Sequence, residues 1–209
     1  MRARWVWIGA LLLYAVFSLW YNNWRAPLSP AEIDHYLELM SSRSESSPER
    51  IATVRAFLEA DDGGEFLMLN LMRLTPDPIT MPGAAAPQSA EEVMEGYTGY
   101  LLPAIVARGG HPAFLGQAAA GYVEDWGVEP NPGWSSGAVV RYRSRRDMME
   151  VATDPAFEPA HAFKLAAMPN TLAFPLSPAF VVVGPRIWVA LLLALIAALA
   201  HLGLQARRS

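Results

Sequence analysis

The feature that most restricts this sequence of 209 residues is a long apolar segment without formal charge near each end. The first segment covers residues 5–21, and the second covers residues 187–204. A helix needs about 17–25 apolar residues to cross the hydrocarbon core of a bilayer. Because both segments are apolar around the whole helical circumference, neither has a polar face to turn toward water. The sequence therefore predicts one transmembrane helix at each end, with the lipid bilayer as a partner.

A cleaved signal peptide is the alternative interpretation of the first segment. The end of the segment and the residues after it, SLWYNNWRA from Ser18, contain no small-x-small cleavage pattern. Aromatic side chains gather at both ends of the segment, as in the belts that mark membrane interfaces. They are Trp5, Trp7, Trp20, Tyr21 and Trp24. We therefore expect an uncleaved anchor.

A buried core helix is the alternative for the second segment, and its apolar character on every side argues against that alternative. Ala190, Ala194 and Ala198 are spaced four residues apart, which predicts a stripe of small residues for close packing against the first helix or a second copy. We expect His201 to lie at the membrane interface and to have no functional role.

Basic residues flank the two segments unequally, and this predicts their orientation. Two arginines precede the first segment and one follows it, whereas one precedes the second segment and two follow it. These residues are Arg2, Arg4, Arg25, Arg186, Arg207 and Arg208. Both comparisons place the termini in the cytoplasm. We expect a two-pass protein of the cell (inner) membrane whose central domain is extracytoplasmic, or periplasmic in a Gram-negative bacterium.

The charge of the central region excludes several classes of function. Residues 26–185 hold 10 basic and 20 acidic residues, a net charge of −10. Such a domain repels nucleic acid, which we therefore exclude as a partner. The sequence contains no cysteine, so disulfides, cysteine-ligated zinc and thiol nucleophiles are excluded too. We expect no metal and no cofactor.

The pattern of the central region predicts an α+β domain preceded by two short helices. Residues 28–41 and 48–60 have helical spacing with serine N-caps, and they form a helical stalk within residues 25–64. The following elements are a strand, a helix, two strands, an interrupted helix and a last strand. Their ranges are 65–74, 89–108, 113–123, 134–143, 144–168 and 170–176. This β-α-β-β-α-β order is ferredoxin-like.

Several local sequences within residues 65–177 resemble those of the DUF1330 family, which is part of the dimeric α/β-barrel superfamily. They are the strand FLMLNLMRL, the helix carrying Tyr97 and Tyr100, Gly109-Gly110 before the second strand, VVRYRS at 139–144, the DPAFEPAH run and TLAFPL in the closing strand. The resemblance implies a homodimer in which two sheets enclose a barrel. It implies no settled activity, because relatives in the superfamily range from monooxygenases to isomerases and haem enzymes.

A polar residue in an apolar strand is the main indication of a ligand pocket. Asn70 shares one strand face with Met72, and a buried amide requires a partner. The alternative, that Asn70 bonds to a neighbouring backbone group, is equally open. We take six side chains as candidates for ligand binding: Asn70, Met72, Tyr97, His111, Trp134 and Arg141.

Other motifs indicate chemistry only weakly. The run GWSSG at 133–137 matches G-x-S-x-G, but a loop precedes it and a strand follows it, unlike a nucleophile elbow. The histidines are too widely spaced for a metal motif, although a ligand role for His111 or His161 is conceivable. Four arginines between 141 and 146 form either an anion site or ion pairs with the many carboxylates.

The sequence thus predicts an anchor at 1–24, a stalk at 25–64, a DUF1330-like domain at 65–177 and a second helix with a basic tail at 178–209. The favoured function is a small-ligand-binding or accessory module whose ligand is small and hydrophobic. The alternative is a cofactor-free monooxygenase- or isomerase-like enzyme that uses the barrel interior. A third class, a structural partner of another membrane protein, predicts an exposed apolar patch on the stalk.

Overall fold

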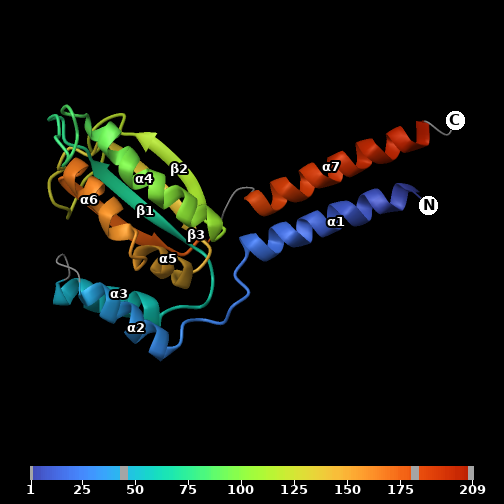
Figure 1. Ribbon diagram of the computed structural model, residues 1–209, viewed down its shortest axis with the longest axis horizontal. Helices are drawn as coiled ribbons and strands as arrows, with labels where there is room; N and C mark the ends of the chain where they lie inside the picture. The colour runs from blue at the N-terminus through green and yellow to red at the C-terminus, as the bar shows by residue number, and fades with distance from the viewer. Residues whose placement is uncertain (1, 43–46, 180–183, 207–209) are drawn as a thin grey trace. The chain divides into compact units, whose positions relative to one another are not determined.

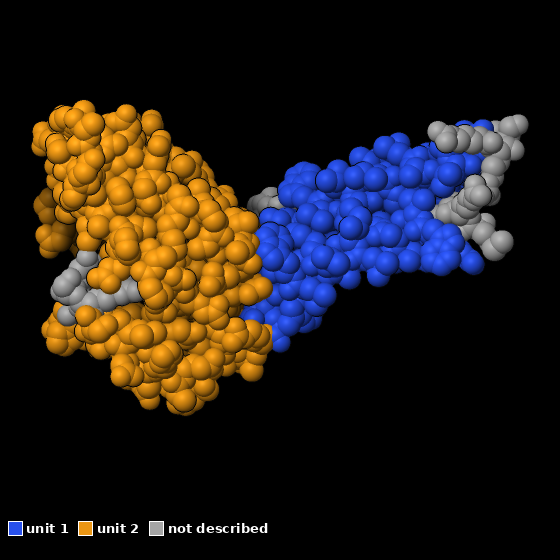
Figure 2. All heavy atoms as spheres, in the orientation of Figure 1, with its two compact units in different colours: residues 1–24, 178–209 blue, residues 25–177 orange. Residues whose placement is uncertain are grey.

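The computed structural model describes residues 2–42, 47–179 and 184–206. The basic tail at Arg207 and Arg208 lies outside the described residues. The chain divides into two compact units, shown in different colours in Figure 2. One unit comprises residues 1–24 and 178–209, and the other comprises residues 25–177.

The first unit is a pair of antiparallel helices, α1 (Arg2–Tyr21) and α7 (Pro185–Ala206), which lie side by side in Figure 1. A polar contact joins them at each end. Trp7 Nε1 donates to His201 Nδ1 at 3.2 Å, and Arg186 Nε donates to Asn22 Oδ1 at 2.6 Å. The Arg186 guanidinium also lies 5.0 Å from the centre of the Tyr21 ring. A side-chain hydrogen bond therefore connects the two helices near each end of the pair.

Both helices have the length and composition to cross a membrane. Mean hydropathy is 1.3 over Arg4–Tyr21 and 2.5 over Pro185–Ala206. Only 6% of each window is buried, so most leucines of both helices point outward. The helix contact differs from the predicted alanine stripe, because Ala197 is buried whereas Ala194 is exposed. The side of α7 that contacts α1 carries Arg186, Ala197 and His201.

The second unit is built on a four-stranded sheet in the order β2-β3-β1-β4, with every neighbouring pair antiparallel. The strands are β1 (Phe66–Arg73), β2 (His111–Gln117), β3 (Ser136–Tyr142) and β4 (Asn170–Leu176). With the helices between them, this is the ferredoxin-like arrangement that the sequence predicts. Strand β2 ends at Gln117, earlier than predicted, because its pairing with β3 ends there, at Ser136.

Helices α4 (Ala90–Ala107), α5 (Arg145–Ala152) and α6 (Phe157–Ala167) lie on one side of this sheet (Figure 1). Ser89 and Glu92 form the capping box that starts α4, and Ser144 caps α5. The predicted interruption between the last two helices occurs at residues 153–156. A proline there follows Asp154, and the residue before a proline is disfavoured in a helix.

The two faces of the sheet differ in what covers them. Phe66 and Tyr142 are register partners, their rings stack, and Phe66 is only 2% exposed beneath the helices. The opposite face carries Leu67, Leu69 and Leu71, which alternate with the covered side chains. Their register partners on β4 are Leu176, Phe174 and Leu172, and Phe114 of β2 lies in the same row because it pairs with Val139, the β3 partner of Leu69. These four side chains are 40% to 60% exposed. One apolar face of the sheet is thus open within a single chain.

Helices α2 (Pro30–Ser41) and α3 (Pro48–Glu59), predicted as a stalk, share a core with α5. Leu37 and Leu58 are buried against Met149 of α5. Among the described residues of the two helices, Leu39 is the one large apolar side chain that is exposed. The two helices are consequently part of the sheet-containing unit, and they present little apolar surface to a partner.

Candidate functional site

A cleft of about 300 Å³ opens between α3, α6 and β4. Three basic side chains line it: Arg50 from α3, and His161 and Lys164 from α6. Thr171 of β4 adds a hydroxyl, and the remaining lining is apolar. Its volume is at the lower end of the range of about 300–1,000 Å³ that small-molecule sites occupy. The cleft therefore suits a compact ligand.

Helical spacing places the side chains of α6 along one side of the cleft. His161 and Lys164 are three residues apart, and Phe157 is four residues before His161, so all three lie on one face of α6. The rings of Phe157 and His161 stack with centroids 5.0 Å apart. This stacking limits the freedom of the imidazole before any ligand arrives.

Tyr97 of α4 lies against the same face of α6. Its ring centroid is 6.3 Å from those of Phe157 and His161, and Lys164 Nζ lies 5.4 Å from the ring centre. An ammonium group at that distance from an aromatic face is attracted to it. The two helices approach closely because Gly96 has no side chain, and a Cβ there would lie 2.7 Å from the Phe163 ring.

Burial changes the acidity of two tyrosines in the sheet-containing unit. It raises the pKa of Tyr97 well above the usual value of 10, and nearby Tyr142 and Tyr100 add to the shift. Burial also raises the pKa of Tyr142 to about 12. Both hydroxyls therefore stay neutral to a higher pH than the hydroxyl of an exposed tyrosine does.

Three of the six predicted ligand residues lie near this cleft. Asn70 and Met72 are the register partners of Ala173 and Thr171, two cleft residues of β4. They face the helices because they alternate with the open-face leucines of β1. The Asn70 amide nitrogen donates to Met68 O at 3.0 Å, so the amide is held by its own strand. Tyr97 is the third, because its ring contacts His161 and Lys164, which line the cleft.

The other three predicted residues, His111, Trp134 and Arg141, lie away from this cleft. His111 and Arg141 are register partners on β2 and β3. The Arg141 side chain is buried, donates to Glu65 Oε2 at 2.7 Å and bonds to Gly109 O. Trp134 precedes β3, and its Nε1 donates to the Tyr122 hydroxyl at 3.0 Å. The structure thus divides the predicted set into residues near the cleft and residues away from it.

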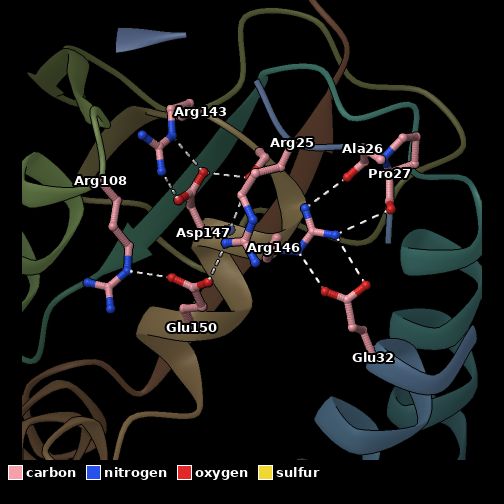
Figure 3. Close-up of polar contacts among 10 residues, drawn as sticks. Arg25, Ala26, Pro27, Glu32, Arg108, Arg143, Arg146, Asp147 and Glu150 are labelled. Carbon is pink, nitrogen blue, oxygen red and sulfur yellow. Dashed lines mark hydrogen bonds and ion pairs between the residues drawn. The ribbon is translucent and has the colours of Figure 1, made fainter. Parts of the chain in front are cut away.

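A second polar cluster holds residues 25–32 against α5. It is formed by Arg146 and Glu150 of α5 together with groups of that segment. Figure 3 shows Arg146 donating to Ala26 O at 2.9 Å, Pro27 O at 3.3 Å and the Glu32 carboxylate at 2.9 and 3.2 Å. Glu150 accepts from Arg25 at 3.0 Å and from Arg108 at 3.1 Å.

The four arginines at 141–146 each pair with a carboxylate of the same chain. The sequence left open an anion site or such ion pairs, and the structure has the ion pairs. The pairs are Arg141–Glu65, Arg143–Asp147, Arg145–Asp61 and Arg146–Glu32. Hydrogen bonds from Arg146 and Ser29 lower the pKa of Glu32 to about 2. These arginines therefore stabilise the fold and the attachment of the N-terminal segment.

The comparison of whole structures agrees with this architecture. RPA0582, a protein of unknown function from Rhodopseudomonas palustris, superimposes with a TM-score of 0.51 at 24% identity, covering 66% of this chain and 97% of that one. Its methylated form gives a TM-score of 0.52 at 23% identity and covers 68% and 96%. This likeness shows the fold. No family model matches the sequence, and no curated protein matches it.

Sequence reasoning did not identify Arg50 and Lys164 as part of a site. His161 and Lys164 carry a signal that could have been found, since they share one face of α6 with the aromatic Phe157. Arg50 carries none, because its helix has the sequence of a solvent-exposed stalk. Only the packing of α3 against the sheet-containing unit brings Arg50 to the cleft.

Proposed function

We propose that this chain is a membrane-anchored domain that binds a small ligand in the cleft between α3, α6 and β4. The observation that carries the proposal is the cleft itself, which is lined by groups from α6, from β4 and from α3, a helix about a hundred residues earlier in the sequence. A concave site with a few convergent polar groups on an apolar wall is the usual form of a small-molecule site.

The anchor consists of residues 1–24 and 178–209, and between them lies a DUF1330-like domain at 65–177 against which residues 25–64 pack. Exposed leucines around α1 and α7 support a lipid environment for both helices. The flanking arginines support cytoplasmic termini and an extracytoplasmic domain.

The open sheet face supports a homodimer. An antiparallel sheet buries an apolar face against another layer, and here helices cover only the other face. Phe114, Leu172, Phe174 and Leu176 remain exposed on the open face. A second copy offers the matching apolar surface, so that two sheets pack face to face.

The ligand-binding proposal is tested by filling the cleft. Ala173→Met places a longer side chain in the cleft, and Leu172→Met, on the opposite face of the same strand, is the control. The full chain in dodecyl maltoside is screened against a broad panel of small molecules by thermal shift. We expect compounds that raise Tm in the parent and the control and fail to do so in Ala173→Met. A panel without any such compound, or a shift that survives in Ala173→Met, contradicts the proposal.

A further inference from the structure

We infer that the β2–β3 loop, residues 118–135, is a docking surface for a basic protein partner, which receives the Trp126 indole in an apolar pocket bordered by arginine or lysine side chains. None of the residues of this loop lines the cleft between α3, α6 and β4. The inference therefore adds a protein partner and does not depend on the ligand-binding proposal.

Hydrogen bonds fix the base of the loop. Trp134 Nε1 donates to the Tyr122 hydroxyl at 3.0 Å, which ties the two sides of the loop together. Asn131 Oδ1 accepts from Gly133 N at 2.8 Å and from Trp134 N at 3.2 Å. The loop is much longer than the connections of about two to five residues that usually join hairpin strands, and long ordered loops are commonly functional. Residues 123–130 are thus presented to solvent on a fixed base.

The tip of the loop exposes large apolar side chains to water. Val123 is 96% exposed, Trp126 is 76% exposed and Val128 is 64% exposed. Gly127, with φ at +66°, allows the backbone to turn between Trp126 and Val128. Apolar side chains gathered on a surface mark interaction sites, and tryptophan is among the residues that contribute most to protein interfaces. The tip therefore offers the apolar centre of an interface.

The polar groups of the tip all carry the same sign of charge. Glu124, Asp125 and Glu129 are exposed, and the sequence has no basic residue between His111 and Arg141. Across the described ranges of the chain, none of the three carboxylates has an ion-pair partner. Charges across an interface are usually complementary, so the surface that covers this tip should be basic.

The same charges argue against the other possible occupants. A lipid surface is disfavoured because carboxylates resist burial in the bilayer and anionic headgroups repel them. Nucleic acid is disfavoured because its phosphates are negative. The loop of a second copy carries the same three charges and would repel this one. A foreign protein with an apolar centre and a basic rim matches both features of the tip.

Site-specific photocrosslinking of the full chain in its host cell tests the inference. p-Benzoylphenylalanine replaces Val128, close to Trp126 in the sequence, and the products are isolated through a tag and identified by mass spectrometry. We expect one product, with a single protein other than this chain, whose crosslinked peptide contains lysine or arginine. Trp126→Ala should lower its yield at least tenfold. The combined loop variant Glu124→Gln, Asp125→Asn and Glu129→Gln should do the same.

Two controls separate the loop from general effects of exposure and charge. The photoreactive residue in place of Leu39, an exposed side chain of α2, should not give this product. A second triple variant removes three exposed carboxylates outside the loop and should leave the yield unchanged. It combines Glu38→Gln, Glu91→Gln and Glu158→Gln. Trp126→Ala should keep the Tm of the parent, because its indole is exposed.

Several results would overturn the inference. They are the absence of a crosslinked protein, a second copy of this chain as the product, reaction with lipid alone, a mixture of many proteins, or a crosslinked peptide without a basic residue. A yield that stays unchanged in Trp126→Ala or in the loop triple variant overturns it as well. None of these results bears on the cleft, which Ala173→Met tests separately.

Discussion

Arg146 is the side chain whose loss should most weaken the attachment of the N-terminal segment. Its side chain is only 5% exposed, and its guanidinium donates to two backbone carbonyls and to both oxygens of Glu32. Arg146→Met keeps the length of the apolar stem and removes all four hydrogen bonds. The two carbonyls then lose their donor, and the Glu32 carboxylate loses its counter-charge.

The magnitude follows from the kind of bond lost. A hydrogen bond to a charged group contributes about 1.5–3 kcal/mol, and a neutral one contributes about 0.5–1.5 kcal/mol. The Glu32 side chain is 37% exposed, so water replaces part of what Arg146 provides. We therefore expect Arg146→Met to lower the free energy of unfolding by about 3 kcal/mol, within the range for breaking a partly buried pair.

Urea unfolding of the full chain in dodecyl maltoside, followed by far-ultraviolet circular dichroism, measures the change. With a slope of about 1–3 kcal/mol/M, the midpoint should fall by roughly 1.5 M. Arg55→Met is the matched control, because the Arg55–Asp34 pair is 45% and 66% exposed. Such a pair contributes less than about 1 kcal/mol. Equal midpoints for Arg146→Met and Arg55→Met would refute the reasoning.

Acid provides a second measurement of the same contact. The folded-state pKa of Glu32 is lowered from 4.5 to about 2, chiefly by hydrogen bonds from Arg146. A lowered pKa stabilises the fold above pH 4.5, and this stabilisation is lost as the pH falls from 4.5 toward 2. In Arg146→Met the loss over that interval should be smaller than in the parent.

Three further predictions concern the sheet, the topology and a buried hydroxyl. Phe174→Glu puts a charge on the open sheet face and should abolish the proposed dimer, so that native mass spectrometry detects monomer, whereas Val123→Glu in the β2–β3 loop should leave the dimer intact. Val123 is 96% exposed and the chain has no cysteine, so Val123→Cys should react with an impermeant maleimide in intact spheroplasts; reaction only after lysis would reverse the proposed orientation. Because burial raises the pKa of Tyr142 to about 12, its ionisation in the unfolded chain should lower Tm between about pH 10 and 12, and Tyr142→Phe should reduce that fall; an unchanged pH profile would contradict it.

Local signals in the sequence predict most of the fold. The capping box of Ser89 and Glu92 marks the start of α4, and the apolar terminal segments become α1 and α7. Strand β2 was predicted too long because propensity alone does not determine where a ladder ends. Its end is set by pairing with β3, whose last partner on β2 is Gln117.

The candidate site is less predictable than the fold because it combines distant segments. Asn70, Met72 and Tyr97 were chosen from patterns within single elements, and they lie beside the cleft. Arg50 is more than a hundred residues from His161 and Lys164 in the sequence. Its place in the cleft depends on tertiary packing, for which no local pattern exists.

The position of α1 before the sheet-containing unit and α7 after it has a consequence for proteolysis. A single cut in the β2–β3 loop, at residues 118–135, would leave one fragment with α1 and the other with α7. If both helices span the bilayer, each fragment stays membrane-bound even after the two separate. Shedding of the domain would require two cuts, one on either side of residues 25–177, and a protease with one accessible site would not release it.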